Sequence, residues 1–179
     1  MHQLFDRMLR AAKLEPALYE EVEHDKTATG QALAAVALSS VAAGLGGVGL
    51  GLPGLIGGAF AALISWFLWS LVVYLVGTKL MPEPQTEADL GQLLRTIGFS
   101  ASPGVLRIFA FIPLLGWLIG TIAGVWMLVA MVIAVRQALD YQSTGRAVLV
   151  CVIGFVAAMI VQFLVLAPLF AGAALVSTM

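Results

Sequence analysis

Charged residues are scarce in this chain, and their scarcity indicates its class. Asp, Glu, Lys and Arg make up 11% of the 179 residues, while 61% are hydrophobic. A soluble domain carries about 25% charged residues, and a core of this size has no room for so much apolar surface. A lipid bilayer accommodates that surface when the backbone is helical. The composition therefore predicts an all-α, polytopic integral membrane protein.

Cysteine, histidine and clustered basic residues are also few. The single cysteine, Cys151, lies in an apolar run, which excludes a disulfide framework and a cysteine-based metal site. His2 and His24 have no second His or Cys at ligand spacing, so we expect no metal and no cofactor. The nine Lys and Arg residues form no concentrated basic face, which argues against nucleic acid as a partner.

The apolar runs lack the groups on which catalysis depends. They contain no paired carboxylates, and their serines have no intramembrane His or Asp to activate them. We therefore expect a protein that is not an enzyme. The missing carboxylates also argue against a proton-coupled carrier.

The first 26 residues differ from the rest because charges occur throughout them, without the apolar stretch of a cleavable signal. We expect residues 1–26 to form a cytoplasmic segment and residues 27–179 a membrane domain. Residues 2–13 place apolar side chains on one helical face and basic ones on its flanks. Such a helix lies on the membrane surface or packs against the protein's own loops, and the sequence leaves both open. Pro16 suits the first turn of a second helix, whose tail (residues 19–25) is acidic.

The remaining apolar runs predict five spans, at about residues 31–48, 55–76, 103–115, 117–135 and 147–166. Small residues in the first span allow neighbouring helices to approach closely. The glycine-rich residues 44–58 are expected to turn the chain. Residues 86–98 are amphipathic, with Thr86 and Asp89 in a capping-box pattern, and are expected to form an interfacial helix.

Residues 105–135 are interrupted at Pro113 and Gly116, and they admit one crossing or two. With two crossings, every Lys and Arg except Arg107 lies in a cytoplasmic segment, as the positive-inside rule expects. We therefore expect a short third span that forms a hairpin with the fourth. The amino terminus is then cytoplasmic and the carboxyl terminus lies on the far side.

Two sets of residues are candidates for structural roles. A proposed ion-pair cluster joins the amino-terminal acids to arginines of the membrane domain: Glu21, Glu23 and Asp25 with Arg95, Arg107 and Arg136. Arg107 can instead extend to the lipid headgroups, and Arg136 can pair locally with Asp140. Gly116, Gly120 and Gly124 repeat at every fourth residue, as in a helix-packing face within one molecule or between two.

Several stretches carry a likeness to a known family: residues 19–25 (YEEVEHD), residues 93–99 (LLRTIGF) leading to Pro103, residues 112–116, and residues 126–141. In these stretches the chain resembles the bacterial branch of the Yip-domain proteins, which are relatives of the Ypt/Rab-interacting membrane proteins of the eukaryotic secretory pathway. The resemblance implies five spans and a cytoplasmic amino terminus. Eukaryotic members act in vesicle traffic and organelle shaping, often with small GTPases. Their Asp-Leu-Tyr-Gly-Pro-type segment is missing here, so GTPase binding is not carried over.

These observations predict a non-enzymatic protein of the bacterial plasma membrane that organises the bilayer or scaffolds membrane-protein complexes. Its expected partners are the lipid bilayer and other membrane proteins or further copies of itself. Two alternatives stay open. One is a transporter or channel for a small solute, with the glycine-rich turn and the broken hairpin lining its pathway. The other is an accessory subunit of a larger respiratory or photosynthetic complex.

Overall fold

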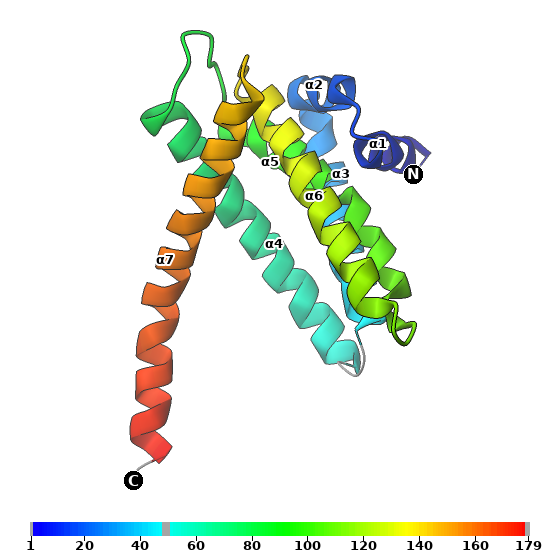
Figure 1. The fold of residues 1–179 in the computed structure, drawn as a ribbon, viewed down its shortest axis with the longest axis vertical. Coiled ribbons are helices and arrows are strands. Elements are labelled where there is room, and N and C mark those ends of the chain that lie inside the picture. The colour runs from blue at the N-terminus through cyan, green and yellow to red at the C-terminus, as the bar shows by residue number, and fades with distance from the viewer. Residues whose placement is uncertain (1, 48–50, 178–179) are drawn as a thin grey trace.

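The computed structural model describes residues 2–47 and 51–177, and it describes side-chain surroundings as far as residue 160. The described elements are helical: α1 (His2–Ala12), α2 (Pro16–His24), α3 (Thr29–Gly46), α4 (Gly51–Leu75), α5 (Leu90–Ser100), α6 (Gly116–Ala138) and α7 (Thr144–Ser177), with the 3₁₀ helices η1 (Lys26–Ala28) and η3 (Ser102–Phe111) and the π-helical turn η2 (Val76–Leu80). The long helices α3, α4, α6 and α7 run away from a common end, where α1, α2 and α5 gather (Figure 1).

Within the part of the chain that the structure describes, three helices are long and apolar enough to cross a bilayer: Lys26–Gly46, Gly51–Leu80 and Gly116–Ala138. They correspond to the first, second and fourth expected spans. The fifth expected span lies in α7, which is apolar over Thr144–Ile160. This helix continues to Ser177, beyond the expected end of the span at about residue 166. Gln162, Pro168 and the residues after them lie outside the part whose side chains are described.

The third expected span is a 3₁₀ helix, η3, rather than an α-helix. Its ten residues extend roughly 20 Å, because a 3₁₀ helix rises about 2.0 Å per residue. It packs between α3 and α6, and its final turns reach the carboxyl end of α3. A side chain at Gly46 would overlap the main-chain oxygen of Arg107 there. The segment therefore runs beside α6 as one arm of a hairpin (Figure 1).

Helix α3 buries a stripe of small residues against η3 and α5. The stripe has the three- and four-residue spacing of one helical face: Ala32, Ala35, Ser39, Ala42 and Gly46. Across from it, a Cβ atom on Gly98 of α5 would lie 2.7 Å from the Cβ atom of Ala32. The small residues of this span thus allow close helix approach, as expected.

Helix α5 differs from the expected interfacial helix in its start and in its burial. It begins at Leu90, because Asp89 and Gln92 form the capping box. The main-chain N–H of Gln92 donates to Asp89 Oδ1 at 2.8 Å. Thr86 lies outside the helix and donates its hydroxyl to the carbonyl oxygen of Leu139 at 3.0 Å. Leu93 and Phe99 are fully buried, since α2, α3, α4 and α6 surround α5. The segment is therefore a core helix rather than a surface one.

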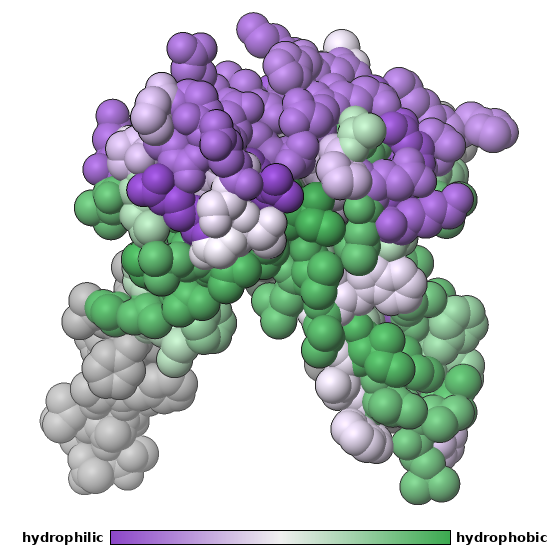
Figure 2. All heavy atoms as spheres, turned by 45° about the horizontal axis from the view of Figure 1, so that its top comes forward, coloured by the Kyte–Doolittle hydropathy of each residue, from purple (hydrophilic) through white to green (hydrophobic). Residues whose placement is uncertain are grey.

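Hydrophilic and hydrophobic side chains separate along the molecule. In the space-filling view, hydrophilic residues gather over the end that carries α1 and α2, while hydrophobic residues cover the legs below them (Figure 2). The legs expose large apolar side chains, including Phe60 of α4 and Leu128 of α6. This separation is what a bilayer around the legs and water around the end require.

Candidate functional site

The hydrophilic end, which we call the polar cap, comprises residues 2–28 (α1, α2 and η1), α5, residues 81–89 and residues 139–143. It contains all the salt bridges among the described residues apart from one that reaches Arg146 in the first turn of α7. The polar cap is therefore where charge is organised, and we consider it the candidate functional site.

Helix α1 is fastened to α2 by arginine–carboxylate contacts. The buried Arg7 lies 2.8 Å from Glu21 and 2.7 Å from Asp25, and Arg10 lies 2.6 Å from Glu21. Hydrogen bonds from Thr27 and from Arg7 lower the pKa of Asp25 to about 2. The hydrogen bond from Arg10, reinforced by Arg7, lowers the pKa of Glu21. Both acids therefore stay ionised and paired at neutral pH.

Arg95 of α5 binds the same carboxyl-terminal end of α2 through a different side-chain network. Its buried guanidinium donates to the carbonyl oxygen of Val22 at 2.9 Å and, through two nitrogens, to that of Glu23. These carbonyls lie in the last turn of α2, where main-chain acceptors lack intrahelical partners and the helix dipole favours a cation. Trp126 of α6 adds a hydrogen bond of 2.7 Å to the carbonyl oxygen of Ala12. The amino-terminal helices are thus docked on both α5 and α6.

The structure gives the amino-terminal acids other partners than the three expected arginines. Glu21 and Asp25 pair with Arg7 and Arg10, while Glu23 meets Arg95 through its main-chain oxygen. The reason is that a short turn folds α1 directly against α2, so its basic residues reach the acids first. The sequence signal for this pairing was the basic flank of residues 2–13 followed at once by an acidic helix.

The other two expected arginines contact neutral groups. Arg107 lies half-buried with its guanidinium 3.0 Å from the Met127 sulfur and 3.4 Å from the Ser39 hydroxyl. Arg136 donates to the carbonyl oxygens of Tyr141 and Gln142, each at 3.2 Å. Arg136 thus stabilises the turn between α6 and α7 instead of forming an ion pair with Asp140 or the amino-terminal acids.

A second network, which the sequence did not indicate, joins residues 81–89 to the α6–α7 turn. Glu83 accepts from the Gln142 amide at 3.1 Å and from Arg146 at 3.1 Å. The amide, followed by the arginine, lowers the pKa of Glu83. The Tyr141 hydroxyl donates to the carbonyl oxygen of Met81 at 2.7 Å. This network fixes the loop after α4 against the start of α7.

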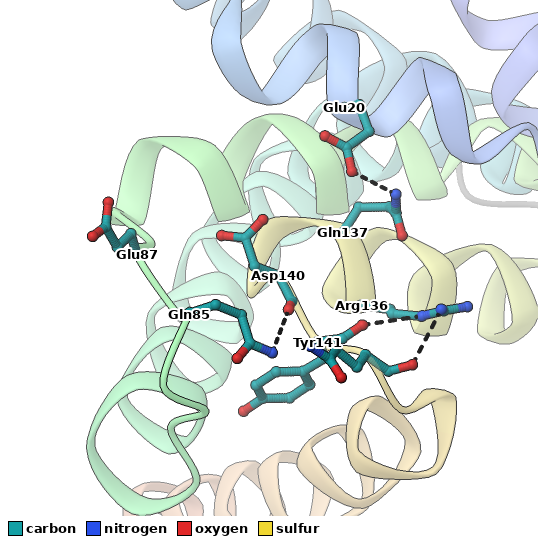
Figure 3. Close-up of a pocket in the computed structure, with 8 residues that line it drawn as sticks. Glu20, Gln85, Glu87, Arg136, Gln137, Asp140 and Tyr141 are labelled. Atoms are coloured by element: carbon teal, nitrogen blue, oxygen red, sulfur yellow. Dashed lines mark hydrogen bonds between the residues drawn. The ribbon is translucent and has the colours of Figure 1, made fainter.

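An open pocket of about 520 Å³ lies between these two networks. Carboxylates, amides and one guanidinium line it: Glu20, Gln85, Glu87, Arg136, Gln137, Asp140, Tyr141 and Gln142. Figure 3 shows Gln137 extended toward Glu20 and Gln85 toward the main chain of Asp140, at 2.7 Å and 3.1 Å. The carboxylates make this face of the polar cap acidic and suit it to cations.

The expected glycine face of α6 has two different environments. A side chain at Gly116 would overlap the main chain of Ala110, so this glycine permits the tight turn between η3 and α6. Gly120 and Gly124 border open space. Within one molecule, the structure therefore uses only the first of the three glycines for a close approach.

Comparisons with known proteins identify the family. None of the curated proteins and none of the solved structures compared matches this chain significantly. The family model of the Yip1 domain matches residues 16–175, which include every helix from α2 to α6 and almost all of α7. Together with its long apolar helices, this match identifies an integral membrane protein, and the chain belongs to the Yip1-domain family.

Proposed function

We propose that this protein organises the membrane without catalysing a reaction, by holding an amphipathic helix at the surface above a five-span domain. The observation that carries the proposal is the exposure of α1. Met8 and Ala11 are buried against the rest of the polar cap, whereas Phe5 and Leu9 are 59% and 56% exposed. Two large apolar side chains at the edge of a polar cap are suited to enter the lipid interface.

The anchoring of α1 makes this helix an effective wedge. Arg7 and Arg10 fix it to α2 before it meets lipid, so adsorption costs little additional ordering. Moving Phe5 and Leu9 from water into the interface contributes up to about 1.5–3 kcal/mol per side chain. A rigidly held insertion on one leaflet favours curvature or the recruitment of neighbouring proteins.

The packing of η3 supports five crossings. This segment extends from the polar cap to the far end of α3, and α6 then returns toward the cap. In this arrangement α1, α2 and residues 139–143 face the cytoplasm of a bacterial cell, and α7 ends on the far side. The open face at Gly120 and Gly124 is then available to a second copy or another membrane protein.

Reconstitution into liposomes that contain anionic lipid tests the proposal. We expect the protein to reduce vesicle diameter or form tubules visible by electron cryomicroscopy. The double variant Phe5→Ser/Leu9→Ser should lose this effect while its thermal unfolding midpoint stays unchanged. Leu114→Ser is a matched control, because Leu114 is 91% exposed but lies at the η3–α6 turn.

The same vesicles separate this function from transport. Spherical vesicles at every protein density, or full remodelling by the double variant, would contradict the proposal. Solute flux that requires the protein would instead support the transporter or channel.

A further inference from the structure

Glu23 is a buried carboxylate with an unsatisfied oxygen. The residue is 2% exposed, and its Oε1 accepts a hydrogen bond of 3.1 Å from the Gln92 amide. Its Oε2 is buried without a hydrogen-bond partner. A buried acceptor left unpaired is costly, and a carboxylate more so, because it has given up its hydration. Oε2 therefore requires a proton, a water molecule or a cation.

Two possible metal ligands adjoin Glu23 on the same helix. One carboxylate oxygen each from Glu20 and Glu23 and one ring nitrogen of His24 lie within 4.8 Å of one another. His24 Nδ1 is 2.9 Å from the Glu20 carbonyl oxygen, and donation of this hydrogen bond leaves the Nε2 lone pair for a metal. Such a bond from the second ring nitrogen commonly orients a metal-binding histidine.

The surroundings leave this cluster with uncompensated negative charge. The carboxylates of Asp140 and Glu20 interact electrostatically with that of Glu23. The Arg95 guanidinium donates to the main-chain carbonyl oxygens of Val22 and Glu23 rather than to this carboxylate. The acidic pocket next to Glu20 opens to solvent and provides an entry path for an ion.

We propose that Glu20, Glu23 and His24 bind one divalent transition-metal ion of the Zn²⁺ class, with water from the pocket completing the coordination. One imidazole and two carboxylates suit Zn²⁺ better than Mg²⁺, which prefers an all-oxygen octahedron. Gln92 and Gln137 already orient the two carboxylates through hydrogen bonds of 3.1 Å and 2.7 Å. The ion would neutralise the Glu23 carboxylate, whose Oε2 has no hydrogen-bond partner among the described residues.

This inference departs from the expectation that no metal binds. That expectation counted only His and Cys spacing, whereas the cluster combines one His with two Glu residues one helical turn apart. The ion would fasten α2 above α5 and the end of α6, because Gln92 and Gln137 belong to those helices. It would therefore strengthen the docking of the amino-terminal helices whatever function the membrane domain serves.

Calorimetric titration of the full chain in detergent, cleared of metal with EDTA and without a histidine tag, tests the site. We expect Zn²⁺ to bind at one ion per chain and to raise the thermal unfolding midpoint, while Mg²⁺ shows no saturable binding. His24→Gln and Glu20→Gln should each weaken Zn²⁺ binding at least tenfold. His2→Gln is a matched control that should leave it unchanged.

Two further readouts keep the test decisive. His24 and Glu20 are exposed, so their variants should unfold at the wild-type midpoint without metal, and binding can be compared on folded protein. Because the metal displaces protons from Glu23 and His24, which face Glu20, Asp140, Arg95 and Gln92, Zn²⁺ affinity should rise between pH 6 and pH 8. Absence of saturable binding, or binding unchanged in His24→Gln, would overturn the proposal.

Discussion

Two buried charged side chains, Arg95 and Glu23, differ in how their polar atoms are paired. Arg95 is satisfied, because the carbonyl oxygens of Val22 and Glu23 accept from its guanidinium. Among the described residues, the Glu23 carboxylate accepts a hydrogen bond only from the side-chain amide of Gln92, and its Oε2 has no partner. Removing the partner of a buried charge lowers the free energy of unfolding, whereas protonating an unpaired buried carboxylate removes the cost of its uncompensated charge. The pH response of the polar cap should therefore be dominated by Glu23.

The sign of that response follows from the raised pKa of Glu23. The carboxyl binds its proton more tightly in the folded state, with a pKa of about 7, than in the unfolded chain at 4.5. The free energy of unfolding should therefore fall as the pH rises through this window, by roughly 3 kcal/mol. The low pKa of Asp25 acts in the opposite sense, but only as the pH falls toward 2.

Thermal unfolding in detergent with EDTA, followed from pH 5 to pH 8, measures this effect. Glu23→Gln should remove most of the decline, because a neutral amide mimics the protonated acid. The raised pKa of His24, caused first by its hydrogen bond to the Glu20 carbonyl, leaves a smaller decline in the same direction. A wild-type midpoint that rises with pH would contradict the assignment.

At the scale of elements, the hairpin depends on the close approach of η3 to α3. Gly46→Ala would force a methyl group onto the main chain at Arg107, and overpacking of this kind costs about 1–3 kcal/mol. Gly58→Ala in α4 meets open space and should be neutral or stabilising by up to about 1 kcal/mol. Unfolding midpoints of the two variants in detergent check the contrast. Equal unfolding midpoints would contradict the close contact between η3 and α3.

Elements were predictable from sequence where their signals are local. Pro16 begins α2 as expected, and the long apolar runs correspond to α3, α4 and α6. The sequence predictions were wrong where the structure depends on contacts between segments that are distant in the chain. Thr86 donates to the Leu139 carbonyl oxygen rather than capping α5. Glu21 and Asp25, which were grouped with Arg95, Arg107 and Arg136, pair with Arg7. Spacing along the chain does not encode which surfaces fold against each other.

For the whole molecule, the charge distribution and the packing point to one arrangement in the bilayer. Charges concentrate in the polar cap, and the legs expose apolar side chains (Figure 2). The scarcity of charge made this separation predictable. The pocket and the orphaned Glu23 oxygen were not predictable, because they depend on how α2, α5 and the α6–α7 turn meet.

Cysteine labelling in intact cells tests the arrangement in the bilayer. In a Cys151→Ser background, Glu87→Cys and Ser143→Cys place exposed thiols on the two loops of the polar cap, and Leu114→Cys places one at the η3–α6 turn. If η3 and α6 both cross, the two cap thiols should resist an impermeant maleimide until the cells are permeabilised, and Leu114→Cys should react in intact cells. If residues 105–135 crossed only once, Glu87→Cys and Ser143→Cys would react from opposite faces. That result would contradict the five-span map, and with it a single polar cap bathed by one aqueous phase.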